Sequence, residues 1–421
     1  MEILIFLFVQ MLLFALALWL VNRSRGREEG MPRRSAERGV TKQLIELREA
    51  RKKSLSMPLT ELARPQEMQE IIGQEEGIRA LRAAMCGKNP QHVLLYGPPG
   101  VGKTCAARLV LEEAKKNPDS PFGADAAFVE VDATCVRFDE RAIADPLIGS
   151  VHDPIYQGAG ALGSQGVPQP KPGAVSKAHC GVLFLDEIGE LHPVQLNKLL
   201  KVLEDRRVHF DSAYYSPENT GIPAHIHDIF QNGLPADFRL IGATTRAGQL
   251  SSPLRDRFGV QLRLELYTPE ELQAIVTRTA GILGVDIEPS GAMEIARRSR
   301  GTPRIANRIL KRVRDFAQVK GSGKVDRMMA DVALSALEID GLGLDRTDRR
   351  MLESIIRNFR GGPVGLETLA ATIGEESVTL EDVYEPYLLQ IGFLNRTPRG
   401  RCVTMKAYEH LGIPFQGQME L

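Results

Sequence analysis

A glycine-rich octapeptide at residues 97–104 constrains the fold of this chain more than any other segment. It follows an apolar, strand-like run at 92–96 and precedes a helix-like run at 106–116. The pattern G-x-x-x-x-G-K-[ST] between a strand and a helix is typical of a phosphate site, because backbone N–H groups and the positive end of a helix dipole converge there. The residues predicted to bind a nucleotide are Gly97, Pro98, Pro99, Gly100, Val101, Gly102, Lys103 and Thr104.

The rest of residues 66–268 has the pattern of an α/β domain. Apolar or alternating runs at 128–132, 181–187, 238–245 and 260–266 predict strands, and helical runs separate them. Such alternation predicts a largely parallel sheet with both faces covered by helices. Ligands of these sheets bind beyond the carboxyl ends of the strands.

Polar residues follow two of the predicted strands. Asp186 and Glu187 end the run at 181–187, and Thr244 and Thr245 end the run at 238–245. We expect Asp186 to bind Mg²⁺ with the Thr104 hydroxyl, and Glu187 to polarise the attacking water of phosphoryl transfer. Thr245 is expected to contact the γ-phosphate or to orient that water, with Thr244 as the alternative.

Two arginines complete the predicted catalytic site. Arg257 is a candidate arginine finger, which a neighbouring subunit in a ring with head-to-tail interfaces would supply; Arg255 is the alternative. Arg304 begins a helix directly after Gly-Thr-Pro at 301–303. From there a lid can bring its positive charge to the nucleotide.

Composition limits the other interpretations. A chain of 421 residues is expected to form two or three domains, and a formal net charge of zero restricts any nucleic-acid contact to a local surface. The five cysteines are widely spaced without a C-x-x-C pair, which is typical of reduced thiols. His225 and His227 in the His-Ile-His-Asp run suggest a metal, but no further ligand cluster is near them in sequence, so a polar loop is favoured.

The N-terminus predicts a membrane anchor. Residues 3–21 are apolar except for Gln10 and would span about 28 Å as a helix. A signal peptide is less favoured, because Glu2 precedes the run and no small-residue cleavage site follows. A buried or oligomerising helix is a third interpretation. Arginines follow the run, so we expect a single-pass protein of the cell membrane with its body in the cytoplasm.

Helical periodicity dominates from residue 269 onward. The pattern predicts a helical lid at 269–340 and, at 341–413, three helices followed by a basic strand pair, which describes a winged helix. The third helix, 380–391, would bury one face, formed by Leu380, Val383, Tyr384, Tyr387, Leu388 and Ile391. The wing residues predicted to contact DNA phosphates are Arg396, Arg399, Arg401 and Lys406. The expected N-terminal divisions are an anchor at 1–22 and a basic linker at 23–65.

Two long loops interrupt the α/β pattern. The first, at 136–177, is rich in glycine and proline around Tyr156, which is either a core residue or an aromatic residue facing a central pore. The second, at 205–235, is expected to be a short hairpin at 208–211 followed by an irregular excursion. Long loops in compact domains are usually functional or disordered, so we expect substrate contacts here.

Several motifs up to about residue 246 are long and specific. They are the apolar N-terminus, Ile72-Gly73-Gln74-Glu75, and the segments 89–93, 138–141, 145–160 and 226–238. With these motifs the chain resembles the ATPase half of the LonB family, which are membrane-anchored Lon-type proteases of the AAA+ class. The resemblance implies that Ile72 lies in the nucleotide site.

A different set of motifs occupies residues from about 242 to 413. They are the segments 242–248, 252–259, 300–308, 361–366, 385–388 and 396–401. This part resembles RuvB, the AAA+ family of Holliday-junction branch-migration motors. Both resemblances imply an AAA+ core, a ring that is expected to be a hexamer, and hydrolysis of ATP with Mg²⁺ by Lys103, Thr104, Asp186, Glu187, Thr245, Arg257 and Arg304. The chain ends in a winged helix where LonB has a protease domain, so peptidase activity is not expected. LonB-like loops replace the RuvB hairpin that docks RuvA, which makes RuvA docking doubtful.

Three functions are consistent with these features. A DNA motor of RuvB type uses the basic wing for sequence-independent contact. A LonB-like ATPase without its protease domain would unfold or remodel a protein, with Tyr156 in the pore. A tethered DNA-binding scaffold would use ATP only to control assembly. We favour the DNA motor because the basic wing is a local nucleic-acid signal.

Overall fold

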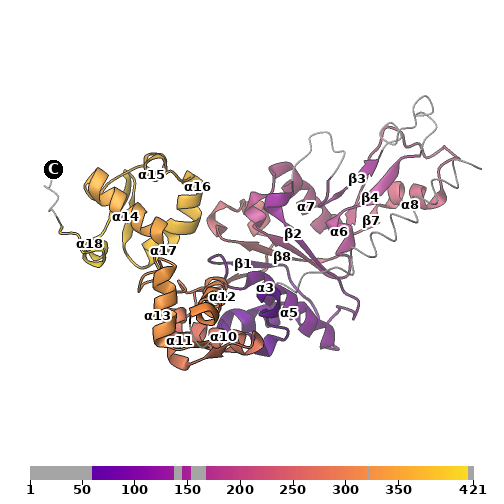
Figure 1. Cartoon of the computed structure of the whole chain (residues 1–421). Helices are drawn as coiled ribbons and strands as arrows, with labels where there is room; N and C mark the ends of the chain where they lie inside the picture. Colours follow the sequence, from indigo (N-terminus) through magenta and orange to yellow (C-terminus); the bar gives the residue numbers. More distant parts are fainter. Residues whose placement is uncertain (1–58, 137–144, 153–166, 321–322, 416–421) are drawn as a thin grey trace, which may run out of the picture. The chain divides into compact units, whose positions relative to one another are not determined.

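The computed structural model describes residues 59–136, 145–152, 167–320 and 323–415 (Figure 1). The chain divides into two compact units, residues 1–62 and 63–421. The first contributes only the short helix α3 (Leu59–Leu62) to the described residues. The second contains every other element of the described ranges, and its parts are an α/β core, a helical lid and a winged helix.

A five-stranded parallel sheet forms the core. Its order is β2 (Phe128–Asp132), β5 (Val182–Asp186), β8 (Arg239–Thr244), β1 (Val93–Tyr96) and β9 (Val260–Arg263), and every neighbouring pair is parallel. The predicted parallel sheet is confirmed. The strand expected at 260–266 ends earlier, at Arg263, because Leu264 and Tyr267 pack into the core of the lid.

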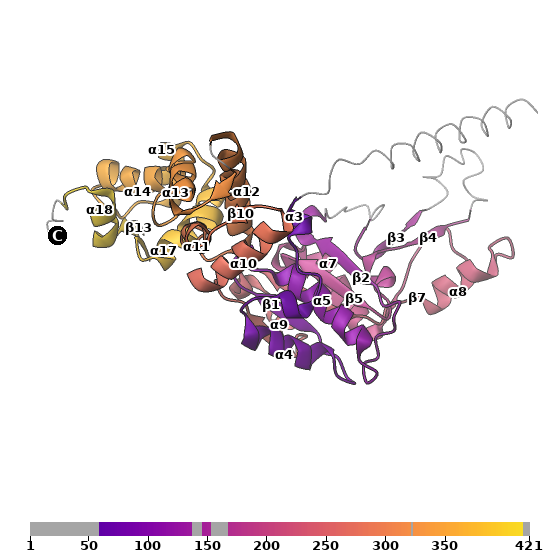
Figure 2. The same cartoon turned by 60° about the horizontal axis from the view of Figure 1, so that its bottom comes forward.

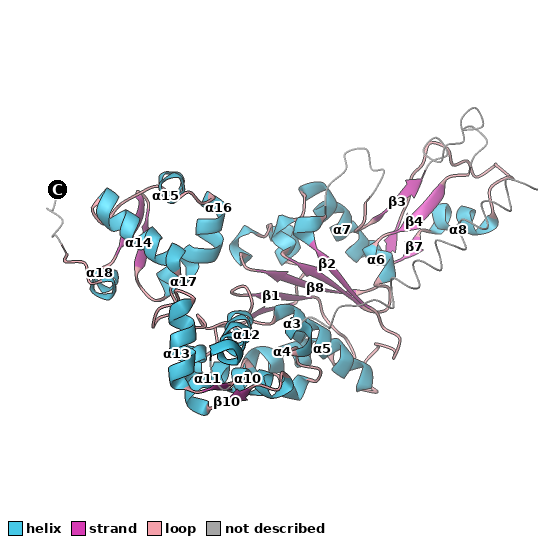
Figure 3. Cartoon of the chain, in the orientation of Figure 1, coloured by secondary structure: helices cyan, strands magenta, loops and turns pink. Residues whose placement is uncertain are grey.

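Helices cover both faces of the sheet (Figure 3). Along β5, Val182 and Phe184 face a cluster that includes α4 (Glu75–Met85) and α5 (Lys103–Lys116). Figure 2 shows these two helices together on one side. Leu183 and Leu185 face the opposite cluster, which includes α6 (Ala174–Lys177) and α7 (Pro193–Asp205). Successive side chains of a strand alternate between faces, so a strand that is apolar throughout serves two cores.

The two predicted loops contain secondary structure of their own and form two excursions from the core. The first contains the antiparallel pair β3 (Gly149–His152) and β4 (Gln169–Pro172). Residues 137–144 and 153–166 lie outside the described residues, and with them Tyr156, which was predicted to be either a core or a pore residue.

The hairpin expected at 208–211 is not formed. Instead β6 (Arg207–Val208) pairs with β7 (Leu234–Pro235), at the far end of the excursion, and α8 (Ala224–Asn232) lies between them. The excursion has aromatic packing of its own, because the rings of Tyr215 and Phe230 stack with their centroids 4.3 Å apart. Aromatic pairs of this kind supply burial that short strands lack.

The lid consists of α10 (Pro269–Ile282), α11 (Pro289–Arg297), α12 (Pro303–Lys320) and α13 (Arg327–Ala336). A short parallel pair, β10 (Asp286–Ile287) and β11 (Lys324–Val325), joins the connection between α10 and α11 to the connection between α12 and α13. Thr268 starts α10 with a capping box to Glu271, which satisfies two of the N–H groups that a helix N-terminus leaves unpaired. The helices bury one core, which includes Val276, Ile295 and Leu310.

The winged helix contains α14 (Arg346–Phe359), α15 (Leu366–Ile373), α17 (Glu385–Gln390), the antiparallel pair β12 (Leu394–Thr397) and β13 (Gly400–Val403), and α18 (Met405–Leu411). The helix predicted at 380–391 is present but changes its winding. α16 (Ser377–Thr379), the π-helical turn η7 (Leu380–Tyr384) and α17 follow one another without a break. A π-turn adds a residue to the helical turn and rotates the residues after it about the helix axis. Val383 is therefore 57% exposed, although the helical period placed it on the buried face.

The predicted membrane localisation, with an anchor at residues 3–21 and the ATPase body in the cytoplasm, requires correction. Within the described ranges, no helix is both long and apolar enough to cross a bilayer. The expected anchor itself lies outside those ranges.

Candidate functional site

The phosphate loop connects β1 to α5 at the carboxyl edge of the sheet. Gly97, Gly100 and Gly102 have φ angles of +147°, +82° and +101°, which side chains rarely tolerate. A Cβ at Gly97 would collide with the Leu264 carbonyl, and one at Gly100 would lie 3.0 Å from the Arg304 Cβ. The loop therefore requires glycine for both backbone conformation and space, as expected of a phosphate cradle.

Lys103 is buried at the start of α5, with only 7% of its surface exposed. Its ammonium donates to the carbonyl oxygens of Gly97, at 2.8 Å, and Pro98, at 3.2 Å. Burial lowers the pKa of Lys103, while the nearby charges of Glu187 and Asp186 raise it. A buried cation that curls back on the carbonyls of its own loop fits an anionic ligand in that loop.

Asp186 and Glu187 follow one another at the end of β5. Burial, and then the charge of Glu187, raise the pKa of Asp186, and the Glu187 backbone N–H donates to the Asp186 Oδ1 at 3.1 Å. Two adjacent carboxylates favour a divalent cation, which relieves their repulsion. The Asp186 carboxylate and the Thr104 hydroxyl are oxygen ligands of the kind that Mg²⁺ prefers, so these residues fit the ion.

Glu187 is held by the end of the neighbouring strand. Its φ angle of +45° turns the chain into η5 (Ile188–Glu190). One carboxylate oxygen accepts from the Thr245 N–H at 3.0 Å and its hydroxyl at 3.2 Å, and from the Thr244 hydroxyl at 3.4 Å. Thr244 is buried and Thr245 is exposed. Both threonines thus contact the carboxylate, and Thr245 is the one that also faces solvent.

The lid reaches the phosphate loop through Arg304 and Tyr267. Arg304, in the first turn of α12, packs against Gly100, and its charge contributes to the lowered pKa of Lys103. The Tyr267 hydroxyl donates to the Val101 carbonyl at 3.2 Å, and burial raises its pKa. Tyr267 was not among the residues predicted from the sequence. The available sequence signal was its position directly before Thr268, the residue that caps the first helix of the lid.

Arg255 and Arg257, the two candidates for the arginine finger, have different partners in the structure. Arg255, at the end of α9 (Ser252–Arg255), donates to the carbonyls of Ala247 and Leu250, both at 3.2 Å. The exposed Arg257 forms an ion pair with Glu204. Arg257 also lines a polar cavity with His92 and Gly259, at the amino ends of β1 and β9. Arg257 therefore lies at the edge of the sheet opposite the phosphate loop of its own subunit. The four residues of β1 separate the two edges by roughly 13 Å.

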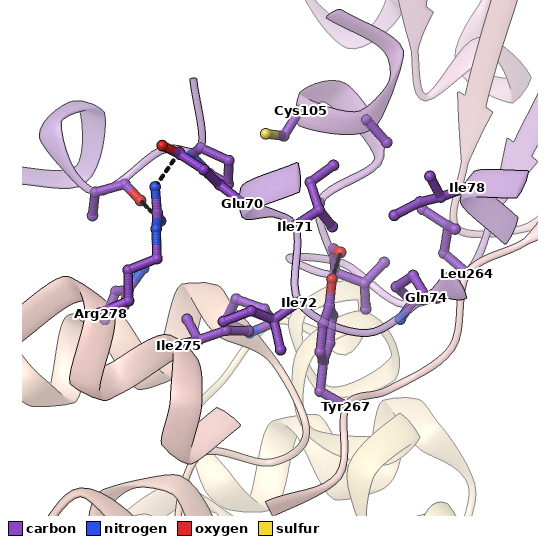
Figure 4. Close-up of a pocket in the computed structure, with 17 residues that line it drawn as sticks. Glu70, Ile71, Ile72, Gln74, Ile78, Cys105, Leu264, Tyr267, Ile275 and Arg278 are labelled. Carbon is purple, nitrogen blue, oxygen red and sulfur yellow. Dashed lines mark hydrogen bonds and ion pairs between the residues drawn. The ribbon is translucent and has the colours of Figure 1, made fainter. Parts of the chain in front are cut away.

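An apolar pocket adjoins the phosphate loop (Figure 4). Ile71, Ile72 and Ile78 come from the N-terminal side, and Ile275 comes from the lid. An ion pair between Arg278 and Glu70 closes one end, and the Gln74 side chain exchanges two hydrogen bonds with the Glu265 backbone. An apolar pocket beside the phosphate loop suits the base of a nucleotide, and Ile72 is one of the residues that line it.

Comparison with known proteins agrees with this geometry. Residues 267–340 match the model of the RuvB AAA lid domain, 341–412 that of the RuvB C-terminal winged helix domain, and 67–226 that of magnesium chelatase subunit ChlI. The RuvB Holliday junction branch migration motor of Thermotoga maritima is 38% identical with a TM-score of 0.64, covering 84% of this chain and 99% of that one. This chain belongs to the RuvB-like AAA+ ATPases.

The chain also has a Lon relative. Lon protease 2 of Bacillus subtilis (strain 168) is 62% identical over 251 residues, which are 59% of this chain and 45% of that protein. The RuvB-like chain thus spans less than half the length of this curated relative. The predicted pairing of Lon-like and RuvB-like segments is confirmed.

As an AAA+ protein of this family, the RuvB-like chain is an enzyme that hydrolyses ATP with Mg²⁺. The ion would be held by Thr104 and Asp186 and would neutralise phosphate charge during hydrolysis. Lys103 and the backbone of residues 97–102 remain the predicted phosphate ligands. Glu187, which accepts hydrogen bonds from Thr244 and Thr245, remains the predicted acceptor of a proton from the attacking water.

The basic wing of the winged helix is less uniform than its sequence suggests. Arg401 is 8% exposed and forms two hydrogen bonds with buried Glu385, at 2.9 and 3.1 Å. Arg396 pairs with Glu381 at 2.9 Å. Arg399 and Lys406 are exposed and, within the described residues, take part in no ion pair. Burial and pairing thus make Arg401 a structural residue, whereas Arg399 and Lys406 are exposed and, among the described residues, have no ion-pair partner.

Proposed function

We propose that this RuvB-like ATPase is a ring motor that couples ATP hydrolysis to movement along DNA, as in branch migration. The observation that carries the proposal is that the chain matches the RuvB lid and winged-helix models without a gap over residues 267–412, directly after the core that carries the predicted nucleotide site. The solved RuvB relative is described as a Holliday junction branch migration motor.

The position of Arg257 supports ring formation. Arg257 lies near the amino ends of the strands, whereas Lys103 and Glu187 lie at the carboxyl ends. An arginine at the far edge cannot serve the site of its own subunit without unfolding the sheet. It can serve a neighbour that packs head-to-tail, which is the interface of a closed ring. We expect a hexamer, measurable as the mass of the ATP-bound assembly by light scattering.

The accessible cations of the winged helix support DNA as the polymer. Arg399 is in the turn between β12 and β13, and Lys406 is the second residue of α18. Both cations are exposed and have no acidic partner among the described residues. Such cations suit phosphate contact, which a translocase needs because it must ignore sequence. Asp382 lies in η7, within the segment predicted as the third helix, and forms an ion pair with Arg246 of the core. This acidic side chain therefore contacts the protein itself, which argues against base recognition by the third helix.

A second candidate is remodelling of a protein chain. The observation that favours it is the 62% identity to Lon protease 2 over 251 residues, which are 59% of this chain. The two excursions differ from the rest of the core in carrying their own small strand pairs, β3 with β4 and β6 with β7. Substrate contact by these segments would direct the same ATPase to polypeptide.

One experiment separates the two candidates. The ATPase rate of the full chain is measured alone, with four-way junction DNA and with unfolded casein. Stimulation by junction DNA, lost in Lys103→Ala, supports the DNA motor. Stimulation by casein alone selects the remodelling function, and a rate that neither polymer changes overturns both.

A further inference from the structure

The Arg300 side chain joins the lid to the winged helix. Its Nε donates to the Gly343 carbonyl at 2.8 Å, and its guanidinium forms ion pairs with Asp345 and Asp348. The same guanidinium lies over the Tyr387 ring, 5.2 Å from its centroid. Only 11% of the side chain is exposed. Arg300 also has a φ angle of +51°, an uncommon conformation for a residue with a side chain.

The acceptors of Arg300 start the first helix of the winged helix. Asp345 and Asp348 form the capping box of α14: the Asp345 N–H donates to Asp348 at 2.8 Å, and the Asp348 N–H donates to Asp345 at 3.1 Å. The Asp348 side chain is fully buried. Withdrawing the guanidinium would leave a buried carboxyl without its cation, which is costly. The first turn of α14 is therefore fixed to Arg300.

The connection between lid and winged helix is rigid elsewhere too. Asp340 accepts from the N–H groups of Leu342 and Leu344, at 2.9 and 2.8 Å. The Tyr387 hydroxyl donates to the Leu342 carbonyl at 2.6 Å. Residues 340–344 thus form a braced joint, and a displacement of Arg300 moves α14 instead of being absorbed by a loose linker.

The segment that begins at Arg300 also contacts the phosphate loop. The Gly301 carbonyl accepts from the Tyr267 N–H at 2.9 Å, and the Tyr267 hydroxyl in turn reaches Val101 in the phosphate loop. Arg304, four residues after Arg300, packs on Gly100. Residues 300–304 therefore contact the phosphate loop at one end and the winged helix at the other.

We propose that Arg300 is a positioning residue that transmits nucleotide-dependent movement of the lid to the winged helix. A change at Arg304 or Tyr267 reorients the start of α12, and Arg300 carries that change to the first turn of α14. The planar guanidinium suits this role, because it binds two carboxylates and an aromatic face in one fixed geometry. This inference rests on the proposed DNA function in one respect only, which is the measurement of ATPase stimulation by DNA.

Hydrogen exchange of the full chain tests the proposal. Amide exchange of α14 is compared with ADP and with a non-hydrolysable ATP analogue, in the native protein, in Arg300→Ala and in Arg314→Ala. Arg314 is a matched control, because it is a lid arginine that pairs locally with Asp315. We expect a nucleotide-dependent difference in α14 that Arg300→Ala abolishes and Arg314→Ala retains, with nucleotide protection of α5 unchanged in all three.

A second variant is needed if Arg300→Ala unfolds the winged helix. If Arg300→Ala exposes α14 with both nucleotides, Arg300→Met combined with Asp348→Asn removes the charges of Arg300 and of the fully buried Asp348. The Asp345 carboxylate also loses its partner, but it is 39% exposed and keeps contact with water. Loss of the nucleotide-dependent difference in this folded variant supports the proposal. A native-like difference in either folded variant, or no difference in the native protein, overturns it.

Stimulation of the ATPase by junction DNA provides the second readout, and we expect it to fall about fivefold or more in Arg300→Ala. Absence of DNA stimulation in the native protein would count against the DNA motor, while the exchange result would still decide the role of Arg300.

Discussion

Thr245 donates both its backbone N–H and its hydroxyl to the same carboxylate oxygen of Glu187, at 3.0 and 3.2 Å. The contact joins the ends of β8 and β5, so the residue expected to sense the γ-phosphate also holds the residue expected to activate water. Orientation of a catalytic base by a second group is a general requirement of proton transfer in enzymes.

Glu187→Gln should lower the ATPase kcat by about 10²–10⁴-fold with little change in the Kd for ATP, because the amide accepts no proton but fills the same space. Steady-state kinetics and calorimetric titration measure the two constants. Glu190→Gln, an exposed neighbour in η5, should behave as the native protein. Near-native turnover in Glu187→Gln would remove Glu187 from the mechanism.

Mixing two inactive variants should restore hydrolysis. Arg257→Ala lacks the finger and Lys103→Ala lacks the phosphate contact, so neither is expected to turn over alone. In mixed rings, a Lys103→Ala subunit supplies Arg257 to the intact phosphate loop of its neighbour. The ATPase rate is followed against mixing ratio. Arg263→Ala, an exposed arginine on β9, should be active by itself. A mixture as inactive as its components would refute action between subunits.

The wing arginines should have separable effects. Arg399→Ala should weaken DNA binding equally for unrelated sequences and lower the salt slope of log K by about 1, because it removes one phosphate contact. Arg401→Ala should instead destabilise the winged helix by about 3–5 kcal/mol, because it strands the buried Glu385 carboxylate. Fluorescence anisotropy and chemical denaturation measure these quantities. An unchanged salt slope in Arg399→Ala would exclude this residue from the interface.

Acid should destabilise the core through His92. Its Nδ1 accepts from the Leu240 N–H at 2.9 Å, and burial, with the charge of Arg239, lowers its pKa from 6.5 to about 4. A depressed pKa gives stability that is present above pH 6.5 and is lost as the pH falls toward 4. The loss should approach about 3 kcal/mol in the unfolding free energy, measured by urea denaturation. His92→Gln should flatten this dependence and exposed His225→Gln should not; equal slopes in all three proteins would contradict the assignment.

Local patterns accounted for much of the fold and the nucleotide site. The loop at 97–104, the carboxylates after β5 and the threonines at the end of β8 were predicted from motif and strand position alone. A parallel sheet brings the carboxyl ends of its strands to one edge, so residues far apart in the chain are placed together once the strands are recognised. The winged helix was predictable because helical period and a basic strand pair are also local signals.

Other features depended on contacts that no local pattern encodes. Val208 pairs with Leu234 across the second excursion rather than within a hairpin, and the π-turn exposes Val383. The position of Arg401 beside the exposed Arg399 predicts a phosphate ligand, yet the ion pair with Glu385 buries it. Charge is visible in a sequence, whereas the partner that neutralises it is not.

The amino-acid sequence by itself determined that this chain folds around a phosphate loop and ends in a winged helix, because short-range spacing is sufficient to specify both. Only the tertiary structure decided which cations remain available, that Arg257 lies at the edge opposite its own phosphate loop, and that Arg300 ties the lid to α14. These properties come from long-range packing, in which burial and ion pairing between distant segments change what each side chain can do.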